Sequence, residues 1–183
     1  MAAYEVQLAS YILGKFYLGT DIKYKCGNAK LQKLVVIAQF RRMYISGKQL
    51  FEASISVNPC GFGVRSISNF FPIDLCGEVE TTPDDQNRRI DPASIHEAPE
   101  LGELYDGGMR FVESEDVDWI RNAFCRFGSY SAKELGDIMN NMRLHKVDSM
   151  YLDLNYLKNH LKQMIDEDCE DGNEIAKYIK EGV

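Results

Sequence analysis

The chain has 183 residues, of which 45% are apolar, and it carries a formal net charge of −7. A domain of this size buries roughly 70% of the surface that its unfolded chain exposes, so it can be stable without disulfides or a bound metal. No apolar run comes close to the ~20 residues that a membrane span needs, and the first residues lack the basic and apolar stretches of a signal peptide. We therefore expect one cytoplasmic domain over residues 1–183, without membrane contact.

The charge is spread unevenly along the chain. Residues 1–50 hold eight Lys or Arg and two Asp or Glu, which gives +6. Residues 51–110 hold four and eleven, which gives −7, and residues 111–183 hold nine and fifteen, which gives −6. A basic segment can bind nucleic acid or an acidic protein, or it can pair with the acidic remainder of the same domain. We favour the internal pairing, and nucleic-acid binding stays open as the alternative.

Residue types that carry catalytic or metal chemistry are scattered. The five cysteines lie singly without C-x-x-C spacing, and none of the three histidines belongs to an H-E-x-x-H motif. We expect no metal, no cofactor and no enzymatic activity, although an enzyme with a less obvious site in residues 72–110 is an alternative. Cys125 follows an apolar residue in a predicted helix and should be a core thiol. The acidic run 166–171 should be solvated, because unpaired carboxylates stay in water.

The first part of the chain predicts two helices and a strand. Apolar residues at helical spacing indicate an amphipathic helix over 4–17 and a second helix over 29–46. The second is apolar on most sides, which is typical of a helix at the centre of a domain. Alternating apolar and polar residues over 50–57 predict a half-buried strand. Residues 58–63 are rich in turn formers and predict a break, followed by a short helix over 64–71.

A long connection and further helices complete the prediction. Residues 72–110 are acidic and hold four of the five prolines, so we expect a variable loop, with partial strands at 77–80 and 108–112 that close a small antiparallel sheet with 50–57. Helical spacing and capping residues, such as the predicted cap Ser114, then indicate helices over 116–127, 131–144, 153–166 and 174–180, the last one frayed. The predicted fold class is mainly α, a compact bundle of six or seven helices with a small antiparallel β element.

Two polar and aromatic features of the predicted helices allow more than one interpretation. Gln32 and Gln39 lie seven residues apart and share one helix face. Either they form hydrogen bonds inside the core, which is the usual role of buried polar groups, or they line a groove. Trp119 stands about one position away from the apolar stripe of its helix, so it either wedges into the core or anchors a partner.

Four sequence runs carry a family resemblance. They are K-L-Q-K-L-V-V-I-A-Q at 30–39, S-G-K-Q-L-F-E at 46–52, A-S-Y-I-L at 9–13 and F-G-S-Y-S-A-K-E-L at 127–135. Together they resemble the signature of the Panacea domain family, which includes SocA-like antitoxins and phage-associated GepA-type proteins.

The match is that of a distant member. Gln49 stands where the family usually has a proline after Gly-Lys, and G-F-G-V at 61–64 takes the place of a G-P-V turn. The resemblance covers roughly residues 4–143. Neither the connection at 72–110 nor the additional C-terminal helices of residues 150–183 match anything specific.

The resemblance implies a mainly helical fold with a small β element and a role in a toxin–antitoxin system. Members of the family neutralise a toxin by direct contact or hand it to a protease. We accordingly predict a single Panacea-like domain that binds a protein partner, with a nucleic-acid-binding regulator that uses the basic first quarter as the alternative. The residues predicted to lie near the partner are Gln32, Gln39, Arg41, Arg42 and Lys48.

Overall fold

The computed structural model describes residues 3–17, 28–70 and 113–181, and helices dominate them. These residues form seven α-helices and a three-stranded antiparallel sheet, which confirms the predicted mainly α class with a small β element. The helices are α1 (Tyr4–Tyr17), α2 (Asn28–Ser46), α3 (Arg65–Phe70), α6 (Ser114–Phe127), α7 (Ala132–Asn140), α8 (Leu154–Glu170) and α9 (Glu174–Lys180), with the 3-10 helix η2 (Arg143–His145). The strands are β1 (Ile55–Asn58), β2 (Gly61–Val64) and β3 (Tyr151–Leu152).

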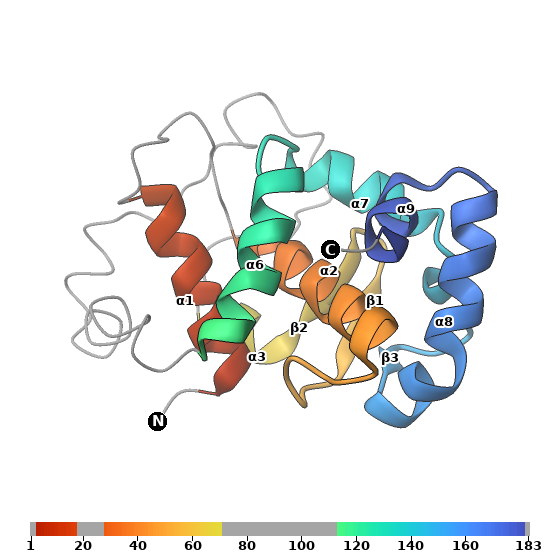
Figure 1. Cartoon of the computed structure of the whole chain (residues 1–183), viewed down its shortest axis with the longest axis horizontal. Coiled ribbons are helices and arrows are strands. Elements are labelled where there is room, and N and C mark those ends of the chain that lie inside the picture. Colours follow the sequence, from red (N-terminus) through yellow and green to blue (C-terminus); the bar gives the residue numbers. More distant parts are fainter. Residues whose placement is uncertain (1–2, 18–27, 71–112, 182–183) are drawn as a thin grey trace.

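The α2 helix runs through the middle of the molecule (Figure 1). It contacts α1, α3, α6, α7, α8, α9 and β2. Every residue from Leu34 to Phe40 is buried. A helix can bury consecutive residues only when other elements pack on all of its sides, so the apolar sequence of residues 29–46 does specify a central helix.

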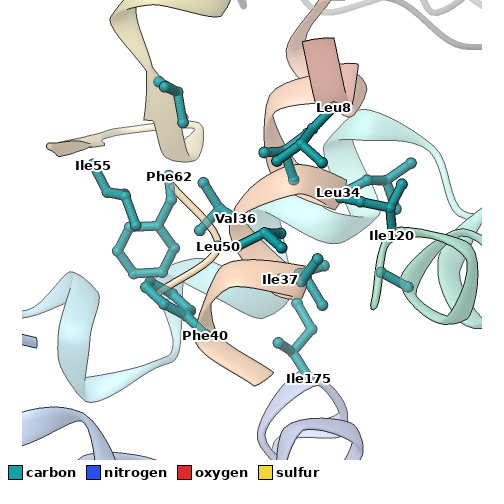
Figure 2. Packing of buried hydrophobic residues seen from close by; sticks show 14 of the residues in the cluster. Leu8, Leu34, Val36, Ile37, Phe40, Leu50, Ile55, Phe62, Ile120 and Ile175 are labelled. Carbon is teal, nitrogen blue, oxygen red and sulfur yellow. The ribbon is translucent and has the colours of Figure 1, made fainter. Parts of the chain in front are cut away.

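The core extends from both sides of α2 (Figure 2). Leu34 lies with Leu8 of α1 and Ile120 of α6 on one side. Phe40 meets Phe62 of β2 on the other, where the two rings pack edge to face with their centroids 5.3 Å apart. Burial of a side chain of this size contributes roughly 1.5–3 kcal/mol. One apolar cluster therefore joins the first helix, the sheet and the later helices through α2.

The sheet has the strand order β2-β1-β3, and β1 is antiparallel to both neighbours. The prediction for this region was partly wrong. Residues 61–64, interpreted as the end of a break and the start of a helix, form the buried strand β2, and β1 occupies only Ile55–Asn58. A two-residue turn joins the two strands, and Gly61 after it has a φ of 108°, a conformation that favours glycine.

The hairpin packs closely against α7, and glycines make this possible. A Cβ added to Gly136 of α7 would stand 2.6 Å from the carbonyl oxygen of Cys60, and one added to Gly61 would stand 3.3 Å from the Cα of Gly136. The tip is also held by polar side chains. Asn140 Nδ2 donates to the Pro59 carbonyl at 2.9 Å, and His145 Nε2 lies 2.7 Å from the Asn58 carbonyl. The turn-rich sequence thus builds a two-strand element that packs against α7 and η2.

The helix starts confirm one predicted cap and correct another. The Ser131 hydroxyl accepts from the Glu134 N–H at 3.1 Å, and the Glu134 carboxylate accepts from the Ser131 N–H at 2.7 Å, which is the predicted capping box. The hydrogen bond from the Ser131 backbone lowers the pKa of Glu134. Ser114 is not the cap of α6, because Glu113 occupies that position without a side-chain cap bond.

The C-terminal third is packed more completely than the sequence predicted. The α8 helix continues to Glu170, and α9 is not frayed, because Asn173 caps it and four of its seven residues are buried. Asp168, expected in solvent with the rest of run 166–171, is 1% exposed. Both of its oxygens accept from the Arg143 N–H at 3.1 Å, and Oδ1 also accepts from Arg143 Nη1 at 2.9 Å. A partner 25 residues away therefore makes this burial possible.

Two further predictions concern Cys125 and the strands expected at either end of the connection 72–110. Cys125 is exposed, not buried, because Ala123 and Phe127 are the residues of this part of α6 that are fully buried. The strands expected at 77–80 and 108–112 lie outside the described residues, as does the whole of the connection 72–110. Within the described ranges, the partners of β1 are β2 and β3.

Candidate interaction surface

Gln39 lies inside the protein and holds the segment that follows α2. It is 1% exposed. Its Oε1 accepts from the N–H groups of Leu50, at 2.5 Å, and Phe51, at 3.2 Å, and its Nε2 donates to the Phe51 carbonyl at 2.9 Å. The segment around Phe51 belongs to neither a helix nor a strand, so its buried backbone groups need side-chain partners. Gln39 is therefore part of the scaffold.

Gln32, which lies seven residues before Gln39 on α2, has a similar role. Its Oε1 accepts from the Val64 N–H at 2.8 Å. In an antiparallel ladder, residue pairs that exchange main-chain hydrogen bonds alternate with pairs that do not, and Ile55–Val64 is a pair that does not. The Val64 N–H therefore points away from β1. The contact needs glycine at position 63, where a Cβ would stand 2.7 Å from Gln32 Oε1. Gln32, which is partly exposed, thus covers the outer edge of β2.

Arg42 belongs to a buried polar cluster that joins three helices. Arg42 and Asp116 are 8% and 4% exposed, and Arg42 Nη1 donates to Asp116 Oδ1. The Tyr4 hydroxyl donates to Asp116 Oδ2 at 2.6 Å, and burial raises the pKa of this hydroxyl. Arg42 Nη2 also lies 3.9 Å from Glu115 Oε1. The cluster holds α1 and α2 against the start of α6, so the charge of Arg42 is used internally.

Arg41 fastens the last helix to α2. It is 6% exposed, and its Cζ atom lies 4.2 Å from the centre of the Tyr178 ring. Its Nη2 donates to the Glu181 carbonyl at 3.1 Å, just beyond the end of α9. A cation is favoured both over an aromatic ring and at the negative end of a helix dipole. Arg41 therefore stabilises the docking of α9.

Lys48 is the one residue of the five predicted partner-binding residues whose side chain is exposed. It follows the end of α2, and its N–H donates to the Ser46 hydroxyl at 3.2 Å. Gln39, Arg41 and Arg42 are buried, and Gln32 is partly exposed. These side chains face different neighbours, namely the segment after α2, α9, α6 and β2, so the structure does not bring the five together as one surface.

The basic first quarter is also largely turned inward in the part that is described. Its buried cations are Lys30, Lys33, Arg41 and Arg42. Lys30 Nζ donates to the Gly128 carbonyl, just beyond the end of α6, at 2.5 Å. Buried cations cannot contact a phosphate backbone. Arg42 pairs with the carboxylates of Asp116 and Glu115, as the internal-pairing interpretation expects, whereas the hydrogen bonds described for Lys30 and Arg41 are with main-chain carbonyls.

Large apolar side chains that are exposed lie mainly in and beside the strand β3. Among the described residues they are Ile45, Met150 and Tyr151, with exposures of 39%, 74% and 47%. Met150 and Tyr151 are neighbours in and beside β3, whereas single exposed apolar residues are common and need no explanation. Sequence reasoning missed them, because a strand of two residues has no alternation that a pattern search can detect.

The geometry of β3 leaves one residue of its main chain facing outward. The Val57 N–H donates to the Met150 carbonyl at 2.9 Å, so Tyr151, next along the ladder, directs its N–H and carbonyl away from β1. The Ser149 hydroxyl binds both groups, accepting from the Tyr151 N–H at 3.3 Å and donating to the Tyr151 carbonyl at 2.7 Å. Since Gln32 and α7 cover β2, β3 is the open edge of the sheet in the described part of the chain. We call Ser149–Leu152 the β3 edge.

Neither a metal site nor a membrane-spanning helix is supported by the residues that the structure describes. Across 3–17, 28–70 and 113–181, no three His, Cys, Asp or Glu side chains gather closely enough to hold a metal ion. Over those ranges no helix has the length and apolar character that crossing a bilayer requires. Trp119 is partly buried and packs against the core, in agreement with the wedge interpretation.

The chain was also compared with known proteins. No protein-family model, no curated protein and no solved structure matches it. The resemblance to the Panacea domain family therefore rests on the residue runs quoted for it, and its functional content is a proposal.

Proposed function

We propose that this protein is a cytoplasmic protein-binding module that acts by contact, without catalysis, in the manner of an antitoxin. It neutralises a toxin by covering it directly or by presenting it to a protease. The observation that carries the proposal is the β3 edge, where Met150 and Tyr151 place two large apolar side chains in solvent at the uncovered side of the sheet. Exposed apolar patches on a well-packed domain are typical of protein–protein contact.

The placement of the motif residues supports the proposal in an indirect way. Gln32 and Gln39, the two glutamines of the run 30–39, hold the hairpin and the segment before it. The run that resembles the Panacea family therefore reads as a signature of the scaffold, and the partner contact falls on another element.

Nucleic-acid binding has weaker support. The affinity of such proteins comes largely from Lys and Arg that neutralise phosphates. Of the five Lys and Arg in residues 1–50 whose side chains are described, only Lys48 is exposed, and the whole chain is acidic. Binding that is insensitive to added salt would be the further argument against this alternative.

Co-expression tests the proposal. The chain and the product of the gene beside it are expressed together in bacteria, with growth and affinity co-purification as readouts. We expect the chain to rescue growth from a toxic neighbour and to form a stable complex with it. The variant Met150→Ser/Tyr151→Ser should lose both, and the control Lys158→Ser, at an exposed position on α8, should keep both. Absence of any stable protein complex, with no rescue, contradicts the proposal.

A further inference from the structure

The β3 edge also indicates how a partner is bound, which deepens the proposed function and rests on it. The outward N–H and carbonyl of Tyr151 are spaced as one bonded position of an antiparallel ladder. Such a position accepts an extended chain that donates one hydrogen bond and accepts one. Side chains of an added strand alternate between its faces, so one apolar residue of that strand would lie beside Tyr151, which is 47% exposed.

Ser149 occupies this position in the free protein. Its hydroxyl satisfies both main-chain groups of Tyr151, so the edge is not left open to unspecific pairing. Ser149 is itself exposed. When another chain takes over the two hydrogen bonds, its hydroxyl can turn to water at little cost. The Ser149 hydroxyl therefore competes with an incoming strand for the N–H and the carbonyl of Tyr151.

The size of the edge selects the kind of occupant. The pairing position of the edge is a single residue, Tyr151, because Asp153 beyond the edge caps α8 by accepting from the Tyr156 N–H at 2.7 Å. A stable complex buries roughly 1,600 Å² in total, far more than two copies of such a short edge bury by pairing with each other. The edge fits an extended segment of a larger partner, whose remaining surface supplies other contacts.

We propose that the β3 edge binds an extended segment of its protein partner by strand addition, with the partner's main chain displacing the Ser149 hydroxyl from Tyr151. The segment carries an apolar side chain that packs against Tyr151. Main-chain hydrogen bonds supply affinity in this mode of recognition, and the side chains beside the edge supply selectivity.

A displayed library of random 12-residue peptides, selected on the full-length chain, tests strand addition. Tyr151→Pro removes the outward N–H without touching the bonds to β1, a position where a strand tolerates proline. We expect this variant to bind the selected peptides at least tenfold more weakly, while the matched variant Tyr151→Thr, which keeps the N–H, loses less. Ser149→Ala removes the competing hydroxyl and should tighten binding roughly fivefold, the worth of about one hydrogen bond.

A second measurement keeps the test valid if Tyr151→Pro does not fold. Selected peptides are N-methylated one residue at a time, and strand addition predicts that methylation abolishes binding at one position, the residue whose N–H donates to the Tyr151 carbonyl. Equal binding to Tyr151→Pro and the unmodified chain, loss at every methylated residue, or no selected peptide at all would overturn the proposal, as would self-association of the chain through this edge.

The two proposals fail separately. A neighbouring toxin that still binds Tyr151→Pro at full strength leaves the partner-binding function intact and removes strand addition. Peptides that bind the edge as described, in a chain that forms no complex with any co-expressed neighbour, leave strand addition and remove the antitoxin-like function.

Discussion

The run 30–39 of α2 and the β3 edge differ in the way that matters most for function. The run looks functional in sequence, with lysines and glutamines between apolar residues, yet it lies at the centre of the fold. The β3 edge has no recognisable motif, yet Met150 and Tyr151 are among the most exposed apolar side chains that the structure describes. Polar residues in a sequence motif can thus serve to hold the fold together, whereas a contact surface can lack any recognisable sequence pattern.

The physical reason lies in the chain between α2 and β2. Leu50 and Phe51 are buried but belong to no ladder, and buried backbone groups must find partners. A glutamine supplies a donor and an acceptor on one side chain, so Gln39 can satisfy both groups of Phe51. The following predictions test this contrast between scaffold and surface.

The largest effect is expected at the buried ion pair. Asp116→Asn removes the buried counter-charge of Arg42, which is 8% exposed, and breaking such a pair costs about 3–5 kcal/mol. Urea denaturation should report this loss in the free energy of unfolding. The control Asp118→Asn removes an exposed partner of Arg121 in the same helix and should cost less than about 1 kcal/mol. Equal losses in both variants would mean that the cluster is not a joint of the fold.

Gln39 should come next. Gln39→Leu leaves two N–H groups and one carbonyl of residues 50 and 51 without partners, and we expect a loss of about 2–4 kcal/mol in the free energy of unfolding. Gln49→Leu is the matched control, because the Gln49 side chain makes one exposed hydrogen bond, to Glu52 at 3.3 Å. A Gln39 variant as stable as the control would show that the segment does not depend on this side chain.

Gly136 tests the close contact between α7 and the hairpin. Gly136→Ala places a Cβ 2.6 Å from the Cys60 carbonyl oxygen, and overpacking of this kind costs about 1–3 kcal/mol although alanine favours a helix. Asp137→Ala, at the exposed neighbouring position, is the control. Thermal unfolding followed by circular dichroism distinguishes them, and a Gly136→Ala variant with a raised midpoint would contradict the packing described here.

Asp166 should show a small effect with a defined pH dependence. Its pKa lies below the ordinary value of 3.8, first because Lys180 and then because Tyr44 donate hydrogen bonds to it. A carboxylate with a depressed pKa in the folded state stabilises the protein above its unfolded pKa. The wild type should therefore exceed Asp166→Asn by up to about 1 kcal/mol at neutral pH. The difference should shrink once the pH falls below the unfolded value and disappear as it passes through the depressed pKa, and a difference that does not change with pH in the acidic range would refute the assignment.

The β3 edge should show the smallest effect on stability. Met150 is 74% exposed, so Met150→Ser should change the free energy of unfolding by less than about 0.5 kcal/mol. The same substitution should weaken binding to a co-purifying partner. A large loss of stability would place Met150 with the scaffold and would remove the contrast on which the functional proposal rests.

Much of the helical architecture could be predicted from the sequence, because helical spacing and caps are local signals. The central position of α2 follows from its apolar surface, and the Ser131–Glu134 capping box follows from two residues three positions apart. The residues chosen for partner binding could not be placed in this way. Their orientation depends on partners distant in sequence, such as Asp116 for Arg42 and Tyr178 for Arg41.

The remaining differences have similar physical causes. The β2 strand was missed because Gly61 and Gly63 are read as turn residues, whereas here they allow close approach by α7 and by Gln32. Asp168 is predicted to lie in solvent because its partner, Arg143, is 25 residues away and no sequence pattern links the two residues. The strand β3 has two paired residues, and the exposure of the β3 edge is a property of the assembled sheet.

Amide hydrogen exchange, followed by NMR, tests the central claim that the motif of α2 builds the scaffold and the β3 edge makes the contact. In the free chain the amides of Leu50, Phe51 and Val64, which bond to glutamine side chains, should exchange nearly as slowly as global unfolding allows, while the Tyr151 amide exchanges fast. Binding of a partner or selected peptide should protect Tyr151 locally, whereas the other three amides should slow only by the amount that binding adds to the global stability. Fast exchange at Leu50, Phe51 and Val64 in the free chain, or protection by the partner that omits Tyr151, would contradict the claim.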